Sequence, residues 1–477
     1  MEKSEKTMSV DRVAIIGGGI AGLTAAFSLR QLRPNIEVDL FEAASRVGGS
    51  IRTERTGEYL IEHGADMFAT EPPAAIDLCR ELGIENELQM PLATARGAAI
   101  VHHGKLVRIP EGFVLMRPTR LWPMVTTSLL SVTGKLRLLA EPFVRKRQNL
   151  HDESIESFVI RRLGRETLER LVQPLVGGIY TGDVSALSMA ATMPQFWEME
   201  SRDGSLFRAT RRRNKEGTDT TEQNSAGARY EKFRSFPEGM ERLVRELELR
   251  VESERIHRST KIVRLNREDR GWTLASESRE FGPFDHVIVA TPAKHASMLL
   301  ADVATEASEE LSQIRFASSA VVAVVVRHSE MDSTMNVAGF VVPIAENRKV
   351  LAVSFTGDKF AGRTPSGLRL VRVFIGGELQ AELLKLSDEQ LVQLAKEELR
   401  SLIGLRGEPI MTKVVRWIDA MPQYHVGHLQ RLAKIDASIA MQPGLSLIGN
   451  SLHGVGIAPT IAQARKAARK IVTASPA

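Results

Sequence analysis

Short apolar runs alternate along the chain with segments of helical periodicity, and this pattern predicts a mixed α/β (α+β) fold. Residues 12–16 form an apolar run typical of a buried parallel strand, residues 23–31 have helical composition, and residues 36–41 alternate apolar and polar positions. Strand, helix and strand within about thirty residues predict one βαβ unit near the start of the chain.

Helical patterns predominate from about residue 70 to 250, and strands return after residue 251. The second half predicts a meander (255–265 and 272–275), a buried strand (286–290), a β-rich stretch (317–375), a helix (388–402), a strand (413–418) and a C-terminal helix (458–472). Because the strands at 12–16 and 286–290 are far apart in sequence, we expect a Rossmann-like nucleotide-binding domain built from discontinuous segments, with other domains inserted.

Composition narrows the class of protein. The chain has 477 residues, 43% hydrophobic and 25% charged, which is close to the globular average and excludes a disordered or fibrous protein. No apolar stretch approaches the ~18 residues that a membrane-spanning helix needs. The net charge of +5 is too thinly spread to predict a nucleic-acid partner. The basic residues of 208–215 run into a polar stretch, and we expect a solvated loop there.

The single cysteine, Cys79, excludes a disulfide within the chain and a thiolate metal cluster, so no metal site is predicted. One cysteine is typical of a reducing compartment. The first residues include acids and no apolar segment, unlike a signal or transit peptide. We therefore expect a cytoplasmic protein.

The strongest local motif is Gly17-x-Gly19-x-x-Gly22, placed between the first strand and the first helix. In a dinucleotide site the first glycine permits a tight turn, the second lets the backbone approach a pyrophosphate, and the third allows close helix packing. Glu42 follows at the end of the second strand, where a carboxylate accepts hydrogen bonds from a ribose. The motif predicts an adenine dinucleotide held at a helix N-terminus.

Further glycine-rich segments favour FAD over NAD. Gly48 and Gly49 bring a second stretch of backbone close to the cofactor, and Glu62-His63-Gly64-Ala65 follows. Near the C-terminus, residues 454–457 open a helix whose N-terminus can stabilise the negative charge of a reduced flavin.

Taken together, these segments resemble the FAD-containing amine oxidase superfamily, which includes phytoene desaturases and protoporphyrinogen oxidases. Three stretches are similar to its oxygen-dependent porphyrinogen oxidases, especially the bacterial soluble branch: Gln173 to Asp183 (QPLVGGIYTGD), Arg416 to His428 (RWIDAMPQYHVGH) and Asn450 to Ile457 (NSLHGVGI). The resemblance runs in order from about residue 11 to 472. It implies oxidation of a porphyrinogen to a porphyrin in haem biosynthesis, with three O₂ giving three H₂O₂, and it favours coproporphyrinogen III over protoporphyrinogen IX.

The resemblance also implies a division into three parts. An FAD-binding domain would comprise 11–70, 230–295 and 440–477, a largely helical domain 71–95 and 112–229, and a β-rich substrate domain 96–111 and 296–439. Peripheral membrane contact and ferrochelatase are the partners it suggests beyond substrate and O₂, and it leaves monomer and dimer open.

The predicted site residues follow from the glycine motif and the resemblance. Residues expected to line a non-covalent FAD are Gly17, Gly19, Ile20, Ala21, Gly22, Glu42, Ala43, Arg46, Gly48, Gly49, Glu62, His63, Gly64, Ala65, Ile262, Trp417, Asn450, Val455, Gly456 and Ile457. Those expected at the substrate are Arg96, Gly178, Phe340 and Phe374. Arg96 belongs to a segment, 94–110, that predicts a hairpin turning near Gly104, and we expect it to bind a propionate.

No catalytic side chain is assigned, because pyrrole nitrogens and imine–enamine tautomerism can move the protons. His63 and His428 are the titratable candidates, and a lone histidine is more often structural. Two other classes stay open: a different flavoenzyme, such as an amine oxidase or carotenoid desaturase, and a non-catalytic flavoprotein that delivers or senses porphyrin. The chain has only four tyrosines, which disfavours the tyrosine-rich cage of an amine oxidase.

Overall fold

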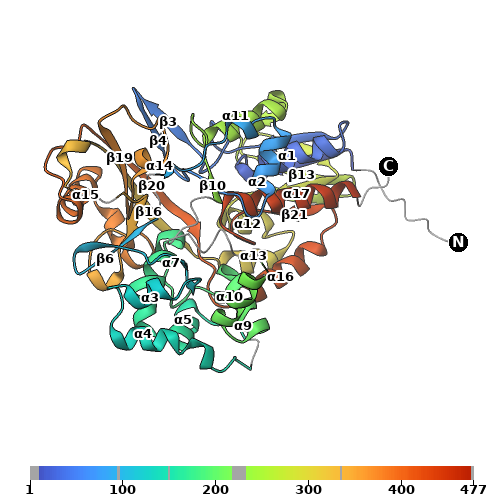
Figure 1. Ribbon diagram of the computed structural model, residues 1–477. Helices are drawn as coiled ribbons and strands as arrows, with labels where there is room; N and C mark the ends of the chain where they lie inside the picture. The colour runs from blue at the N-terminus through green and yellow to red at the C-terminus, as the bar shows by residue number, and fades with distance from the viewer. Residues whose placement is uncertain (1–9, 94–96, 149–150, 217–231, 333–335, 474–477) are drawn as a thin grey trace.

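A five-stranded parallel sheet forms the first half of the architecture in the computed structural model, which describes residues 10–93, 97–148, 151–216, 232–332 and 336–473. Its order is β11-β2-β1-β15-β21, from strands β1 (Arg12–Ile16), β2 (Glu37–Phe41), β11 (Ile256–His257), β15 (His286–Val289) and β21 (Leu445–Leu447). The sheet therefore joins segments more than 400 residues apart, and the predicted discontinuous nucleotide-binding fold is confirmed (Figure 1).

Both faces of this sheet are covered, which explains the continuous apolar run of β1. Val13 and Ile15 pack toward helices α1 (Ile20–Leu32), α2 (Ala74–Glu81), α11 (Glu241–Arg250) and α17 (Ile457–Thr473). Ala14 and Ile16 pack on the opposite face, with the meander β12 (Ile262–Glu268), β13 (Gly271–Ser276) and β14 (Glu280–Phe284) and with α12 (Ala293–Leu300), α13 (Thr305–Ser312) and α16 (His428–Ala440). Successive side chains of a strand point to opposite faces, so the four positions of β1 after Arg12 are all buried.

A seven-stranded, mostly antiparallel sheet forms the second part. Its order is β20 (Met411–Pro422), β16 (Phe316–Arg327), β19 (Leu368–Gly376), β18 (Ala352–Ser354), β17 (Gly339–Val341), β6 (Ala99–His102) and β7 (Lys105–Arg108). Helix α15 (Asp388–Ile403) packs on one face. The predicted hairpin is present as β6 and β7, with His102 opposite Lys105 around Gly104. It extends the edge of a sheet otherwise built from residue 316 onward.

The third part is helical and lies below the two sheets in Figure 1. It contains α3 (Trp122–Thr126), α4 (Val132–Leu139), α5 (Ile155–Leu163), α6 (Arg165–Thr167), a π-helical turn η4 (Leu168–Val172), α7 (Gln173–Tyr180), α8 (Met189–Thr192), α9 (Pro194–Asp203) and α10 (Leu206–Lys215). The expectation of a loop was wrong over 208–215, because these residues form α10, and the polar stretch from residue 217 to Gly227 lies outside the described residues. Arg212 of this helix forms ion pairs with Asp203 and Glu216, and Ala209 is buried beneath it.

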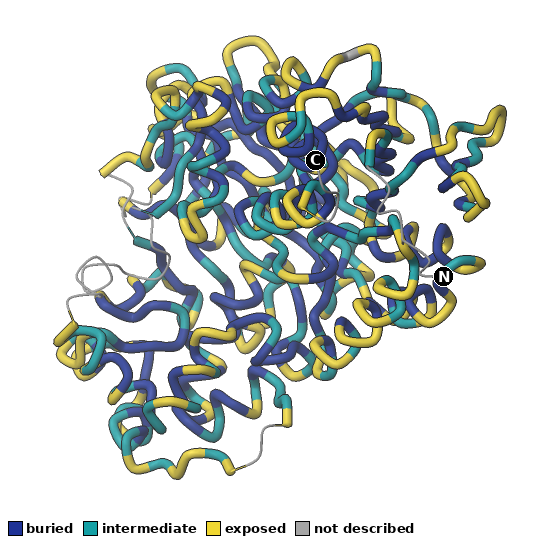
Figure 2. Tube along the Cα trace, turned by 90° about the vertical axis from the view of Figure 1, so that its right-hand side faces the viewer, coloured by how far each residue is buried: buried dark blue, intermediate teal, exposed yellow. Residues whose placement is uncertain are grey.

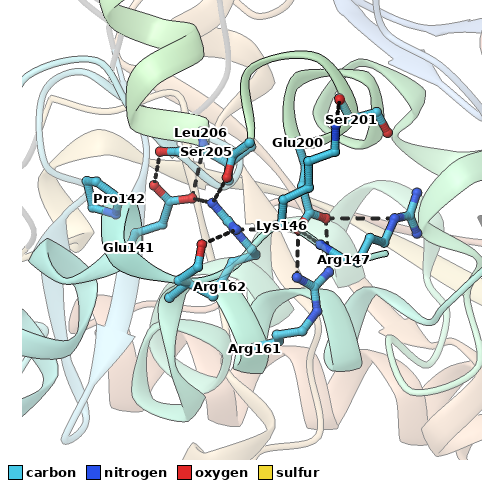
Figure 3. A network of polar contacts seen from close by, with 12 residues as sticks. Glu141, Pro142, Lys146, Arg147, Arg161, Arg162, Glu200, Ser201, Ser205 and Leu206 are labelled. Atoms are coloured by element: carbon cyan, nitrogen blue, oxygen red, sulfur yellow. Dashed lines mark hydrogen bonds and ion pairs between the residues drawn. The ribbon is translucent and has the colours of Figure 1, made fainter. Parts of the chain in front are cut away.

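Buried charges hold these helices together, as Figure 3 shows. Glu141, Arg162 and Glu200 are fully buried. Arg162 pairs with Glu141 and lies 3.4 Å from Glu200, while Glu141 accepts hydrogen bonds from the Ser205 hydroxyl and the Leu206 N–H at the start of α10. Removing one partner of a buried ion pair leaves an uncompensated charge, which is strongly destabilising. The network therefore fixes the placement of α5, α9 and α10.

The remaining elements are short connectors. They are β3 (Thr53–Thr56), β4 (Tyr59–Glu62), β5 (Phe68–Ala69), β8 (Phe113–Val114), β9 (Arg117–Pro118), β10 (Phe233–Arg234), α14 (Thr356–Lys359) and several 3₁₀ turns, among them η3 (Glu141–Phe143). Figure 2 shows buried segments through the interior and exposed turns at the periphery. Within the described ranges, no helix is long and apolar enough to cross a membrane. The exact domain boundaries given above stay a prediction.

Candidate active site

The glycine turn between β1 and α1 contains glycines that the fold needs and one that it does not. Gly17 has φ +112°, and a Cβ there would lie 2.7 Å from the carbonyl oxygen of Ala290. A Cβ on Gly22 would lie 1.9 Å from the carbonyl oxygen of Gly17. A Cβ on Gly19, in contrast, would meet no atom within 4 Å. No contact within the protein requires residue 19 to be a glycine, and a glycine there fits the close approach of a ligand.

The helix that follows is prepared for an anion. Gly19 caps α1 without a side-chain hydrogen bond, and the first turn, which contains Ile20 and Ala21, has no acidic residue. Glu42 accepts hydrogen bonds from the Gly18 N–H (2.7 Å) and the Ala44 N–H (2.8 Å). Because a carboxylate has about four acceptor positions, Glu42 can stabilise the turn and still accept from a ribose.

The second glycine pair lies against the first. The Gly48 N–H donates to the Gly18 carbonyl at 2.7 Å, and the Arg46 guanidinium donates to the carbonyls of Val47 (2.6 Å) and Gly49 (2.8 Å). The structure thus brings the predicted residues 17–22, 42 and 46–49 together at the carboxyl ends of β1 and β2. Ala43 is exposed beside them, whereas Ile262 is buried in the core around Phe41.

The C-terminal motif is held by a residue that sequence reasoning missed. The Tyr424 hydroxyl donates to the Asn450 carbonyl and accepts from the Gly454 N–H at 2.9 Å. His428 stacks on the Tyr424 ring at 4.1 Å between centroids, and its Nε2 lies 2.9 Å from the Leu452 carbonyl. Burial lowers the pKa of His428 to about 4, so this histidine is neutral at pH 7. The tyrosine lies within the stretch that carried the resemblance, but nothing in its spacing indicated this contact.

This tyrosine positions the start of α17, where Val455, Gly456 and Ile457 lie. No acidic residue occupies the first turn of α17, and the helix packs along α1. The N-termini of α1 and α17 therefore both offer a positive dipole end without a competing carboxylate.

The segment 62–65 joins the two sheets, with its acidic and imidazole side chains turned toward protein partners. Glu62 is buried and accepts from Arg363 (3.1 Å) and the Met240 N–H (2.8 Å). His63 pairs through Nε2 with Glu54 at 2.8 Å, and burial lowers its pKa against the opposing effect of this carboxylate. Both side chains already bind protein partners, so this segment would contact a ligand through the backbone of residues 63–65.

Trp417 and Arg372 meet this segment from the seven-stranded sheet. Trp417 Nε1 donates to the His63 carbonyl at 2.9 Å, and the Arg372 guanidinium donates to the Gly64 carbonyl at 2.5 Å. Arg372 was not predicted, although an arginine within an apolar strand was a signal that could have been noticed. Both contacts attach the predicted flavin-binding segment to strands β20 and β19.

A row of apolar side chains crosses the face of the seven-stranded sheet that carries Trp417 and Arg372. Val341 is opposite Ala352, which is opposite Phe374 on the next strand, and all three are only half buried although their strands lie inside the sheet. Gly178 on α7 is exposed, and a Cβ there would lie 3.1 Å from Val341. The structure therefore brings Gly178 to the face that carries Phe374, and contact of either residue with a substrate stays a prediction.

One predicted contact is corrected. Phe340 is 1% exposed and packs in the core beneath α15, near Phe355. Alternate residues of a strand point to opposite faces, so Val341 rather than Phe340 faces Gly178. Arg96 lies outside the described residues, so its predicted contact with a propionate stays a prediction.

The residues present fit a flavin dinucleotide: an open Gly19, two helix N-termini without an acidic residue in their first turns, and a carboxylate at the ribose position. In the part of the chain that the structure describes, no group of three or more His, Cys, Asp or Glu side chains could hold a metal ion.

Comparison with known proteins agrees with this site. The family described as flavin containing amine oxidoreductase matches residues 20–472, and the chain belongs to this family of flavin-dependent oxidoreductases. The chain is 32% identical over 466 residues to the coproporphyrinogen III oxidase of Bacillus subtilis (strain 168), covering 97% of this chain and 98% of that protein. It is 27% identical over 498 residues to protoporphyrinogen oxidase 2 of Arabidopsis thaliana, covering 98% of this chain and 95% of that protein.

Solved structures show the same fold. A protein of Exiguobacterium sp. 255-15, provisionally assigned as a protoporphyrinogen oxidase, has a TM-score of 0.84 and 29% identity over 98% of this chain and 99% of its own. Cyclohexylamine oxidase of Brevibacterium oxydans IH-35A shares the fold. It has a TM-score of 0.70 at 17% identity, covering 98% of this chain and 99% of its own.

Proposed function

We propose that this protein is an FAD-dependent oxidase that converts a porphyrinogen to a porphyrin in haem biosynthesis, with coproporphyrinogen III as the favoured substrate. The observation that carries the proposal is the half-buried apolar row of Val341, Ala352 and Phe374, on the sheet face that also carries Trp417, in a chain related over nearly its full length to coproporphyrinogen III oxidases. A flat tetrapyrrole suits such a face, because aromatic and aliphatic side chains bind a macrocycle by area rather than by charge.

Within this proposal the residues of the chain position two flat molecules against each other. When bound, the flavin supplies a two-electron acceptor that O₂ can reoxidise, and three such cycles convert one porphyrinogen and three O₂ into one porphyrin and three H₂O₂. Gly178, at the exposed C-terminal end of α7, offers a backbone carbonyl to pyrrole N–H groups. Trp417 fixes the segment 63–65 and thereby the distance between the sheet face and the glycine motifs. Holding the two reactants in order is the main catalytic contribution of such a site.

The FAD is proposed to be held without a covalent bond. The only cysteine, Cys79, is buried in α2, and burial raises the pKa of its thiol to about 12, so the reactive thiolate is suppressed. Acid or heat should release all of the flavin into the supernatant. Flavin that sediments with the denatured chain would contradict this.

A side-by-side assay tests the reaction and the substrate. Purified protein is mixed with coproporphyrinogen III or protoporphyrinogen IX, and porphyrin fluorescence and H₂O₂ are recorded together. We expect three H₂O₂ for each porphyrin and a higher kcat/KM for coproporphyrinogen III. Porphyrin without enzyme-dependent H₂O₂ would favour the non-catalytic flavoprotein, and oxidation of amines or phytoene instead would favour the other flavoenzymes.

Peripheral contact with an anionic lipid surface is proposed for the helical part. Trp122 and Phe143 are 75% and 86% exposed, and both lie among basic residues such as Arg120 and Arg145. Exposed large apolar side chains beside cations are typical of membrane-surface segments. In a sedimentation assay with anionic vesicles, Phe143→Ser should reduce binding, whereas Leu249→Ser on α11, at a residue that is 76% exposed, should not. Equal binding by both variants would contradict this surface.

Three further features stay predictions. These are a cytoplasmic location, an interaction with ferrochelatase, and a monomeric or dimeric state.

A further inference from the structure

Five charged side chains are buried together beside the backbone of residues 63–65. They are Glu62, Asp66, Lys359, Arg363 and Arg372, and each is at most 7% exposed. Lys359 Nζ lies 2.5 Å from the Asp66 carboxylate, and Arg363 lies 3.1 Å from Glu62. These contacts form two ion pairs, and in each pair the negative side chain balances the charge of the positive one.

Arg372 is the excess cation of this cluster. Three cations face two carboxylates, so the net charge is +1 (3 − 2) when all five groups are ionised. The nearest carboxylate, Asp66, lies 3.6 Å from Arg372 Nη1 and is shared with Lys359. Burial alone would raise the pKa of Asp66, but Lys359 and Arg372 outweigh it and hold the pKa at about 2, so Asp66 is ionised at pH 7.

The excess charge is only partly satisfied by hydrogen bonds. Arg372 Nη2 donates to the Gly64 carbonyl at 2.5 Å, and its Nε–H is buried without a partner. A buried cation with an unsatisfied donor is costly and persists only where something compensates it. The guanidinium also lies 5.2 Å from the centre of the Phe374 ring. Arg372 therefore stands between the proposed flavin-binding backbone and the proposed substrate face.

We propose that Arg372 is a positioning residue that stabilises the negative charge of the reduced flavin, acting through the Gly64 peptide and through its uncompensated positive charge. This rests on the proposed function, in so far as residues 63–65 line the flavin. A bound flavin would carry one more negative charge after accepting a hydride than before, and the substrate would release the matching proton from a pyrrole N–H. A fixed cation in a water-poor site favours the charged product because the surroundings need not reorganise.

Arg369 provides a matched control on the same strand. It is 4% exposed, so it is as deeply buried as Arg372, and it pairs with Asp358 at 2.7 Å. It lies an odd number of residues from Arg372 on β19, and consequently on the opposite sheet face, over the Phe355 ring. Loss of Arg369 should disturb the core to a similar degree without changing the charge beside Gly64.

The experiment measures the midpoint potential and the sulfite affinity of the bound flavin, neither of which requires a porphyrinogen. Arg372→Gln should shift the two-electron equilibrium about tenfold toward the oxidised form, which corresponds to ~30 mV. It should also weaken the sulfite adduct, which carries the same negative charge. Arg372→Lys should retain most of the wild-type potential, and Arg369→Gln should retain all of it. A wild-type potential and sulfite affinity in Arg372→Gln would overturn the proposal.

A second variant, with an expected shift of the midpoint potential in the opposite direction, tests the proposal if Arg372→Gln does not fold. Asp66→Asn removes one negative charge from the cluster, so it should raise the potential, while Asp358→Asn beside Arg369 should leave it unchanged. An unchanged or lower potential in Asp66→Asn would overturn the proposal. These outcomes are separate from the proposed function: a protein with the expected shifts that oxidises no porphyrinogen would refute the substrate, not the role of Arg372.

Discussion

Substitution of Gly19 by alanine separates the needs of the fold from those of the cofactor. Gly19 has φ −71° and ψ −179°, a conformation that alanine adopts without strain, and the added methyl group would meet no protein atom within 4 Å. Alanine stabilises a compatible glycine site by about 0.4–1 kcal/mol but caps a helix less well by a comparable amount. The free energy of unfolding of the flavin-free variant should therefore lie within about 1 kcal/mol of the wild-type value.

Affinity for FAD should fall in the same variant. The methyl group would occupy the space through which the pyrophosphate approaches the turn, and forcing an extra methyl into a packed contact costs about 1–3 kcal/mol. At 1.4 kcal/mol per tenfold, the dissociation constant should rise roughly five- to 150-fold.

The assay combines FAD titration of the apoprotein, followed by quenching of flavin fluorescence, with thermal unfolding without FAD. Gly22→Ala is the contrasting variant, because its methyl would lie 1.9 Å from the Gly17 carbonyl oxygen and should destabilise the apoprotein itself. Wild-type FAD affinity in Gly19→Ala would refute the placement of the cofactor over this turn. Destabilisation of the apoprotein as large as in Gly22→Ala would refute the claim that the fold does not need Gly19.

Three further predictions concern single charges. Glu42→Gln removes a charged acceptor worth about 1.5–3 kcal/mol, so FAD affinity measured by the same titration should fall about tenfold to a hundredfold; unchanged affinity would place the ribose elsewhere. Glu141→Gln leaves Arg162 buried without a full countercharge and should cost on the order of 3 kcal/mol, seen as a large fall in Tm, whereas the exposed Glu252→Gln should change Tm little. The folded-state pKa of His428 is about 4 against 6.5 when exposed, so the unfolded chain binds more protons between these values. The contribution of His428 to stability is therefore complete above pH 6.5 and is lost as the pH falls toward 4, and His428→Phe should flatten that part of the stability curve; an unaltered slope would contradict it.

Much of the local architecture could be predicted from the sequence because its signals are local. The apolar run of β1, the glycine turn and the helix after it are specified by neighbouring residues, and the structure confirms them. The same holds for the hairpin around Gly104, since turn geometry fixes the register of adjacent strands.

Sequence patterns failed where the environment of a residue decides its state. The basic residues of 208–215 suggested a solvated loop, but Arg212 is neutralised by Asp203 and Glu216, and burial of Ala209 stabilises a helix there. Phe340 and Val341 are equally suited to face a substrate by composition. Only the packing of α15 on one side of the sheet assigns Phe340 to the core.

The two positioning residues were beyond reach of the sequence because their partners are distant along the chain. Arg372 lies 308 residues from Gly64, to which it donates, and Tyr424 lies 30 residues from Gly454 across a helix and a strand. The sequence by itself predicted a dinucleotide site, because the glycine motif and Glu42 lie within one βαβ unit. The tertiary structure alone decided which charge lies behind that site, because the excess of cations over carboxylates arises only when β19 packs against the segment 62–66.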